Sequence, residues 1–244
     1  MIRFPAVRVL LATLTLTLAI PLGGTALGGV ETVAAASANP PTCRITDITT
    51  KYHAYTDYTK TVLDWNFRLP ANYAPHDLVP VSRAGLSGGG SVRSILISDL
   101  AAMTRAARAA GAPLAVASAY RSYATQVSTF AYWVRADGYA AAIRGSARPG
   151  HSEHQLGTAI DFKSYGGGAP WGYADWAKTK AGAWMMNNAW KYGFILSYPK
   201  GKQASVCYSY EPWHYRYYGK AIAKEIHNSG LAPRVWLWRN GSSQ

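Results

Sequence analysis

Apolar and polar residues are spaced along the chain in patterns that predict both helices and short strands. Between residues 92 and 103 apolar side chains recur at steps of three and four, until Gly111 and Pro113 interrupt the pattern. This spacing predicts an amphipathic helix that ends at a glycine. The apolar run 114–120 predicts a buried strand, and residues 122–137 predict a second helix. Strand and helix therefore meet at Arg121.

The second half of the chain continues this mixed order. A turn at Gly150 leads to a short predicted strand at 158–162, and residues 176–192 predict a helix that ends at Gly193. Another strand is expected at 194–196 and a final helix at 215–227. Mixed helices and short strands without an internal repeat predict an α+β domain with a small sheet.

The first 38 residues have the composition of an export signal. Arg3 and Arg8 flank the start of an apolar run at 9–22, and small residues at 34–38 follow. This order predicts a signal peptide, residues 1–38, that is cleaved after Ala38, and a protein that is secreted, extracellular or associated with the cell wall. Retention as a membrane anchor is the alternative, but the apolar run is short and is interrupted by Pro21.

Charge favours a polyanionic surface as a partner. After cleavage the chain carries 23 Lys or Arg and 11 Asp or Glu residues, a net charge of +12. A strongly basic exported protein is attracted to polyanions, so we expect contact with an anionic cell-wall surface. Nucleic acid is not expected, because the basic residues are scattered singly and form no recognisable nucleic-acid motif.

Two cysteines, Cys43 and Cys207, fall in the secreted part of the chain. An oxidising compartment and an even count predict one disulfide, which would tie the new N-terminus to the region before Glu211. Two unpaired thiols are the alternative. Lipidation of Cys43 is not expected, because residues 39–42 are not a small apolar run.

Two compact runs, His151 to Asp161 and Glu211 to His214, contain the residues that point to chemistry. His154, Asp161 and His214 can supply three ligands for one zinc ion, which leaves a fourth position open for catalysis. Glu211 is then free to act as a general base.

Arg121 supplies a fixed cation that can stabilise an oxyanion. Taken alone, each of these residues has a more ordinary explanation, such as a hydrogen-bonded histidine, a capping carboxylate or a salt-bridge arginine. Their joint placement favours the metal. His151, three residues before His154, is expected to lie outside the metal shell at the rim of the cleft.

Three blocks of sequence closely resemble the signatures of the VanY-type zinc D-alanyl-D-alanine carboxypeptidases: Ser118 to Ser122, Ser152 to Asp161, and Glu211 to His214. Their order and spacing agree with the family, and the resemblance extends from about residue 60 to 220. It implies a Hedgehog/DD-peptidase-like fold, with a small mixed or antiparallel sheet and flanking helices. The expected organisation is a lead-in at 39–60, the carboxypeptidase domain at 61–230 and a C-terminal tail at 231–244.

The resemblance also implies roles for individual residues. One zinc ion would be held by His154, Asp161 and His214, with Glu211 as catalytic base and Arg121 as electrostatic stabiliser. A second group of residues is assigned to substrate binding: Ser152, Gln126, Ser118 and Tyr120. The expected partner is the peptidoglycan stem peptide, from which a terminal D-alanine is removed, and the expected oligomeric state is a monomer.

Three alternatives stay open at this point. Relatives with the same fold cleave as L,D-carboxypeptidases, and others act as wall-lytic endopeptidases. A non-catalytic wall-binding module is disfavoured, since such a module has no need of both Glu211 and Arg121.

Overall fold

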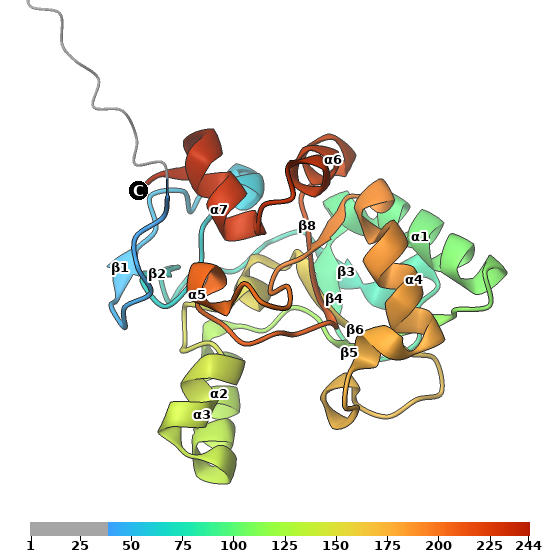
Figure 1. Ribbon diagram of the computed structural model, residues 1–244, viewed down its shortest axis with the longest axis horizontal. Coiled ribbons are helices and arrows are strands. Elements are labelled where there is room, and N and C mark those ends of the chain that lie inside the picture. The colour runs from blue at the N-terminus through green and yellow to red at the C-terminus, as the bar shows by residue number, and fades with distance from the viewer. Residues whose placement is uncertain (1–38) are drawn as a thin grey trace, which may run out of the picture. The chain divides into compact units, whose positions relative to one another are not determined.

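Four short strands form the sheet at the centre of the fold (Figure 1). The structure is a computed structural model that describes residues 39–244, so the predicted signal peptide lies outside the described residues. The strands stand in the order β5 (Leu114–Ser118), β6 (Ala159–Ser164), β8 (His214–Tyr217) and β7 (Phe194–Leu196), and every neighbouring pair is antiparallel. The predicted α+β fold with a small sheet is confirmed.

Two smaller strand pairs flank this sheet. Strand β1 (Ile48–Thr49) pairs in parallel with β2 (Phe67–Arg68), and β3 (Leu78–Pro80) pairs antiparallel with β4 (Ser91–Arg93). Because β1 belongs to the predicted lead-in and β2 to the predicted domain, the lead-in is hydrogen-bonded into the fold.

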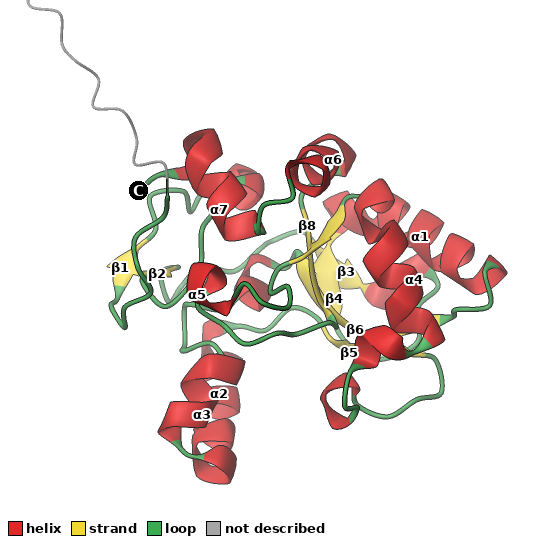
Figure 2. Cartoon of the chain, viewed as in Figure 1, coloured by secondary structure: helices red, strands yellow, loops and turns green. Residues whose placement is uncertain are grey.

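In residues 39–244, seven α-helices surround the strands, and several of them are only one or two turns long (Figure 2). They are α1 (Ile97–Ala109), α2 (Tyr123–Asp137), α3 (Tyr139–Gly145), α4 (Lys180–Asn188), α5 (Gln203–Val206), α6 (Lys220–Ser229) and α7 (Pro233–Leu237).

Helices α1 and α4 cover one face of the sheet and enclose the main core. Leu100 and Met103 of α1 and Met185 of α4 pack in one buried cluster with Ile160 and Phe162 of β6. Successive strand residues point to opposite faces. Asp161, between Ile160 and Phe162, therefore faces away from this core, which leaves the opposite face of the sheet for chemistry.

Strand pairing overrides the helical pattern at two places. Val92 is the first residue of the apolar pattern that predicted a helix, but residues 91–93 form β4, and α1 begins at Ile97. The predicted helix at 215–227 is wrong over its first part, since residues 214–217 form β8 and α6 begins only at Lys220. Gly219, with φ of +79°, separates that strand from α6.

The helix predicted at 176–192 is divided. A single 3₁₀ turn precedes Thr179, whose hydroxyl accepts from the backbone N–H of Gly182 and caps α4. Such a cap starts a new helix where the sequence pattern showed a continuous one. A 3₁₀ turn follows α4 and ends at Gly193, and β7 then occupies the predicted residues 194–196.

The ends of the described chain pack together. Residues 39–244 lie within one compact unit, which includes both the predicted lead-in and the predicted tail. Leu237 and Trp238 share a buried cluster with Val62 and Phe67. Among the described residues, no helix has the length and apolar character needed to span a bilayer.

The predicted disulfide is present. Cys43 and Cys207 are joined at an S–S distance of 2.07 Å across a sequence separation of 164 residues. The bond connects the N-terminal segment to the end of α5, just before the loop that carries Glu211. It therefore braces that loop against the body of the protein.

Helices α2 and α3 form a hairpin that projects from the rest of the molecule (Figure 1). Gln126 is the one residue of α2 that is fully buried, whereas Val127, Tyr132 and Tyr139 are exposed. The Gln126 side chain donates to the Ala147 carbonyl at 2.6 Å and so ties the start of α2 to the segment that follows α3. The hairpin is thus fixed mainly at its base.

Candidate metal centre and active site

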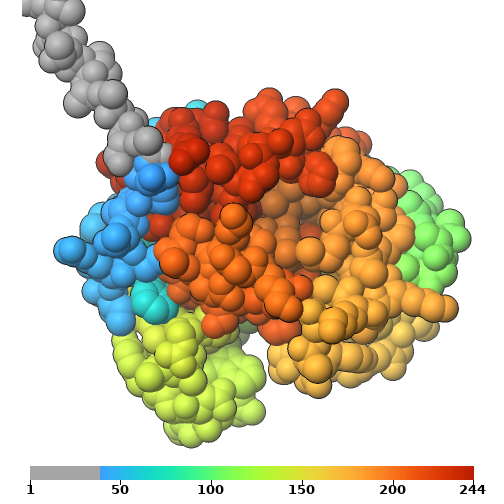
Figure 3. Space-filling model, viewed as in Figure 1, coloured from blue at the N-terminus to red at the C-terminus, as the bar shows by residue number. Residues whose placement is uncertain are grey.

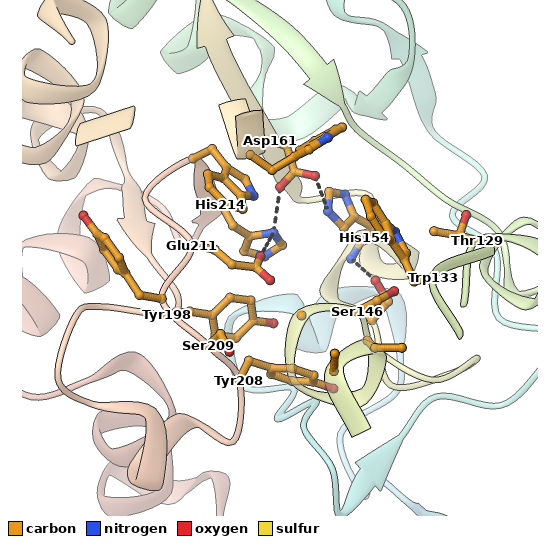
Figure 4. Close-up of a pocket in the computed structure, with 18 of the residues that line it drawn as sticks. Thr129, Trp133, Ser146, His154, Asp161, Tyr198, Tyr208, Ser209, Glu211 and His214 are labelled. Atoms are coloured by element: carbon orange, nitrogen blue, oxygen red, sulfur yellow. Dashed lines mark hydrogen bonds and ion pairs between the residues drawn. The ribbon is translucent and has the colours of Figure 1, made fainter. Parts of the chain in front are cut away.

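Strand register places Asp161 and His214 side by side. They are direct partners in the antiparallel pairing of β6 with β8. The Oδ1 atom of Asp161 lies 2.9 Å from Nδ1 of His214, and its Oδ2 atom lies 3.1 Å from Nε2 of His154 (Figure 4). The carboxylate therefore contacts both imidazoles, each through a different oxygen.

A tight turn brings His154 to the same point. His154 lies in a 3₁₀ turn, Glu153–Leu156, whose first backbone groups are capped by the Ser152 hydroxyl. Gly157 ends the turn with φ of +71°, a conformation that favours glycine. A Cβ atom there would stand only 3.0 Å from the Arg93 side chain. After this turn at Gly157 the chain enters β6, which carries Asp161.

Hydrogen bonds fix which nitrogen of each imidazole faces the centre. Nδ1 of His154 lies 2.7 Å from the Ala119 carbonyl, and Nε2 of His214 lies 3.0 Å from a carboxylate oxygen of Glu153. Both of those partners are acceptors, so each nitrogen donates its proton outward. Nε2 of His154 and Nδ1 of His214 face the centre beside Asp161, where each would offer its lone pair to a bound ion.

The donor set fits zinc. One ligand atom from each of His154, Asp161 and His214 lies within 4.8 Å of the other two, and all three residues are buried. Two imidazoles and one carboxylate are a common zinc-hydrolase set, and outward hydrogen bonds to carbonyl or carboxylate groups are the usual support for such ligands. These three residues would hold the ion.

The pKa values at this centre are strongly shifted. Burial and the nearby Arg121 charge lower the pKa of His154 to about 4, which favours the neutral imidazole that a metal requires. Burial would lower the pKa of His214 as well, but hydrogen bonds with Asp161 and Glu153 raise it to about 10. Burial alone would raise the pKa of Asp161, but its contacts with the two histidines hold that pKa well below the ordinary value.

Glu211 stands beside the ligands without joining them. Its Oε2 atom lies 3.9 Å from Nδ1 of His214. A turn fixes this position, because the backbone N–H of His214 donates to the backbone carbonyl of Glu211 at 3.0 Å. Burial raises the pKa of Glu211 to about 8, against the attraction of His214 and Arg121. A carboxylate in this position, in the pocket but outside the ligand set, can accept and return a proton.

Arg121 lies at the junction of β5 and α2, as the sequence predicted. Its backbone N–H donates to the His154 carbonyl at 3.3 Å, and its guanidinium donates to the Ser118 hydroxyl at 3.2 Å. Burial lowers its pKa, while Asp161 and Glu211 act in the opposite direction. One guanidinium nitrogen, Nε, is buried without a partner among the described residues.

All five predicted chemical residues line one pocket of about 270 Å³. The sheet and the loop before β8 provide one side of this pocket, and the α2–α3 hairpin provides another. Figure 3 shows an indentation between the hairpin and the segments in orange. Beyond the five, the lining includes aromatic and small polar residues from both sides: Thr129, Trp133, Asp137, Ser146, Ser152, Trp171, Tyr198, Tyr208, Tyr210 and Trp213.

The predicted substrate-binding residues are placed differently from one another. Ser152 lines the pocket, although its hydroxyl also caps the turn of His154. Gln126 is fully buried at the hairpin base, while Ser118 accepts a hydrogen bond from Arg121. Gln126, Ser118 and Tyr120 lie outside the lining residues of the pocket. A substrate role for all four stays a prediction.

His151 is outside the metal-ligand group, but it is not at the rim of the cleft. It is 1% exposed, and its ring nitrogens contact the Asp64 carbonyl and the Asp47 carboxylate. The expectation of a rim position was wrong, because contacts with the N-terminal segment bury the ring.

Sequence reasoning missed Glu153 and Arg216, which stand behind the metal centre. Glu153 contacts His214, and Arg216 contacts Glu153 at 2.8 Å. Residues two apart on a strand share a face, so His214 and Arg216 point the same way. A strand prediction at 214–217 would have placed Arg216 on the same face as His214, but that segment was expected to start a helix.

Two imidazoles and a carboxylate that face one point, with a free carboxylate beside them, are the arrangement typical of mononuclear zinc hydrolases. Comparison with known proteins identifies the family. The sequence profile of VanY, D-alanyl-D-alanine carboxypeptidase, matches residues 90–220, more than half of the chain. The chain belongs to the VanY family.

Two relatives illustrate this membership. The chain is 41% identical over 170 residues to YodJ of Bacillus subtilis (strain 168), a protein with a provisional carboxypeptidase name. It is 33% identical over 178 residues to the D-alanyl-D-alanine carboxypeptidase of Enterococcus faecalis (strain ATCC 700802 / V583). These matches cover 68% and 69% of this chain, and 62% of the length of each relative.

Solved structures agree in fold. The L,D-carboxypeptidase LdcB is similar at a TM-score of 0.65 and 36% identity, over 73% of this chain and 85% of that one. A second structure is a mutant of the D,D-pentapeptidase VanY from a VanB-type resistance cassette in complex with Zn(II). It is similar at a TM-score of 0.63 and 32% identity, over 74% of this chain and 99% of that one. The Hedgehog/DD-peptidase-like fold implied by the sequence is confirmed.

Proposed function

We propose that this protein is a zinc-dependent carboxypeptidase that removes the terminal D-alanine from peptidoglycan stem peptides. The observation that carries the proposal is the convergence of His154, Asp161 and His214 on one point, with Glu211 beside them in the same pocket. Membership of the VanY family, and a VanYB structure in complex with D-alanine-D-alanine, support this choice of substrate.

The residues divide the chemical work. When bound, zinc supplies Lewis acidity at the point where the three ligands meet. Glu211 takes a proton from the attacking water and returns it to the leaving amine, a role that fits its place in the pocket beside the three ligands. Arg121 presents a cation toward the same pocket and stabilises negative charge on the carbonyl oxygen of the scissile bond.

Exclusion of water strengthens these electrostatic effects. Asp161 and His214 are buried, and aromatic side chains such as Tyr198 and Trp213 line the pocket around them. Charges interact more strongly where the effective dielectric constant is low. The walls of the pocket therefore contribute to catalysis without contacting the reacting atoms.

Cleavage of the bond between an L-centre and D-alanine is the second candidate. Similarity to LdcB, at 36% identity, and to an L,D-carboxypeptidase from Streptococcus pneumoniae, also at 36%, supports it. Both reactions release D-alanine and require the same metal, base and cation. The two reactions differ in the residue before the released D-alanine, which is a D-alanine in the pentapeptide stem and an L-centre in the tetrapeptide stem.

A direct assay tests the proposal and separates the two reactions. Purified protein without residues 1–38 is incubated with defined pentapeptide and tetrapeptide stems, and the released D-alanine is measured by mass spectrometry. We expect release from the pentapeptide, loss of release with a chelator, and recovery on addition of zinc. Release from the tetrapeptide alone would favour the L,D reaction. Zinc-loaded protein that releases no D-alanine from either stem would refute both.

The setting of the enzyme is part of the proposal. The export pattern in residues 1–38 supports a secreted or wall-associated protein, and the net charge of +12 after cleavage supports attraction to the anionic wall. We propose that it acts there as a monomer. Sedimentation velocity of the purified protein, and fractionation of the producing cells, test these two points.

A further inference from the structure

We propose that Glu153 is a positioning residue, which fixes the orientation of the metal ligand His214 and is itself held by Arg216. This inference rests on the metal site of the proposed function but is independent of the substrate. It adds to the catalytic machinery a buried chain of contacts behind the ligands.

The contacts of Glu153 are short and on both of its oxygens. Oε2 lies 3.0 Å from Nε2 of His214 and accepts the Ser197 hydroxyl at 2.6 Å. Oε1 accepts from Arg216 at 2.8 Å. The side chain of Glu153 is 7% exposed. Burial of an ionised carboxylate destabilises a fold unless hydrogen bonds and an opposite charge compensate for the lost water. Here His214, Ser197 and Arg216 provide that compensation.

Arg216 binds Glu153 on the side away from His214. Its side chain is fully buried. Besides Glu153, its guanidinium donates to the Tyr58 and Thr61 carbonyls at 2.6 and 2.8 Å. It also lies over the Tyr218 ring, with the guanidinium carbon 4.7 Å from the ring centre. These contacts fix the guanidinium, and through it the carboxylate of Glu153.

The consequence for His214 follows from the chemistry of the acceptor. An ionised carboxylate only accepts hydrogen bonds, and the contact with Arg216 favours the ionised form of Glu153. Nε2 of His214 must therefore carry the proton, which leaves the lone pair of Nδ1 directed at the metal centre. Without Glu153 the ring could carry its proton on Nδ1, which would prevent it from binding the ion.

Position in the fold assigns Glu153 to support rather than to chemistry. Neither Glu153 nor Arg216 is among the residues that line the active-site pocket. The Glu153 side chain contacts the ligand His214 directly, so metal affinity should respond to its loss even when no substrate is present.

The test is Glu153→Gln, which preserves size. The single amide oxygen can accept from His214 or from Arg216, and the amide NH₂ then faces the other donor. We expect zinc affinity, measured by competition with a chelating dye, to fall 10- to 100-fold. We also expect the visible absorption spectrum of the cobalt-substituted protein to change. With saturating zinc, kcat should fall while KM stays within a factor of two.

A matched control separates positioning from general stability. Asp64 and Arg234 form another buried ion pair, and Asp64 contacts none of the three ligands in the hydrogen bonds and ion pairs of the described residues. Asp64→Asn should lower the unfolding midpoint yet leave zinc affinity and the cobalt spectrum unchanged. If folded Glu153→Gln protein shows the same unchanged zinc affinity and spectrum, the positioning role is refuted.

A milder variant covers the case in which Glu153→Gln fails to fold. Ser197→Ala removes one hydrogen bond from the same oxygen that His214 uses and leaves all charges in place. We expect a two- to fivefold loss of zinc affinity and a shifted cobalt spectrum. Wild-type values for both would refute the proposal. Because both measurements omit the peptide, they remain decisive even if the enzyme proves to cleave some other bond.

Discussion

The two sides of the active-site pocket are built in opposite ways. The sheet wall, by which we mean β6, β8 and the turn that carries His154, holds every predicted metal ligand and is backed by the α1–α4 core and the Glu153 contacts. The hairpin wall, α2 and α3, contributes Trp133 and its neighbours. It projects from the molecule and exposes Val127, Tyr132 and Tyr139.

This difference suggests that the sheet wall carries out the reaction and the hairpin wall binds the substrate. Ligands for a metal must be held within a few tenths of an ångström, and the buried, cross-strand pair Asp161 and His214 meets that need. A wall anchored mainly at its base can adjust to the body of a peptide without disturbing the metal. We therefore expect changes on the sheet wall to affect kcat and metal affinity, and changes on the hairpin wall to affect KM.

The largest effect should come from the base beside the sheet wall. Glu211→Gln removes the proton acceptor but none of the three ligands, so kcat should fall about 10²- to 10⁴-fold with zinc content unchanged. Release of D-alanine from a pentapeptide stem and metal analysis measure the two. Glu225→Gln, an exposed residue of α6, is the control. Wild-type turnover in Glu211→Gln would remove Glu211 from the mechanism.

Removal of the disulfide tests whether the loop before β8 is held as firmly as the sheet wall. Replacing Cys43 and Cys207 together by serine should lower the free energy of unfolding by about 2–5 kcal/mol, since a long loop is freed in the unfolded chain. Hydrogen exchange should rise near residues 203–211 more than in the hairpin. Denaturant titration gives the stability. An unchanged midpoint, or faster exchange confined to the hairpin, would contradict this assignment.

A smaller effect is expected from the hairpin wall. Trp133→Ala removes an aromatic surface from the pocket lining and should raise KM about tenfold, equivalent to about 1.4 kcal/mol, while kcat and zinc affinity stay near wild type. Tyr132→Ala is a matched control, because this neighbouring aromatic residue is exposed and lies outside the lining. A large fall in kcat for Trp133→Ala would break the division between the walls.

The smallest effect is expected from Asp77. Its carboxylate pairs with Arg93, whose backbone N–H donates to the carbonyl of Gly157. Burial alone would raise the pKa of Asp77, but hydrogen bonds from Arg93 and Ser94 and the Arg93 charge lower it. A depressed carboxyl pKa stabilises the fold above the unfolded value, about 3.8, and this contribution is lost as the pH falls below it. Asp77→Asn should therefore cost about 1 kcal/mol at pH 7. In denaturant titrations the deficit should shrink below pH 4; a constant deficit would argue against the ion pair.

Local chemistry made much of the site predictable. Three ligands, a base and a cation could be predicted because metal ions restrict both the type and the spacing of their ligands. Residues 194–196 were also readable as a strand, since the apolar run there was bounded by glycine. The supporting contacts were not. Glu153 meets Arg216 across 63 residues, and no local pattern encodes which two distant segments will pair.

The same limit explains the errors in secondary structure. Residues 91–93 and 214–217 became strands because partners elsewhere in the chain accept their backbone hydrogen bonds. A residue's own propensity is weak compared with such pairing. The rim position expected for His151 failed for a related reason, because the N-terminal segment that covers it lies about 100 residues away in sequence.

The two ends of the described chain meet on the side of the molecule away from the hairpin (Figure 1). Arg239 donates to Asn39 at 2.8 Å, and Gln244 contacts Thr50 at 3.0 Å. An affinity tag, surface linker or fusion partner joined after Gln244 would accordingly emerge beside the first described residues. Immobilised through that end on a bead or electrode, the protein would turn its hairpin outward to the solution.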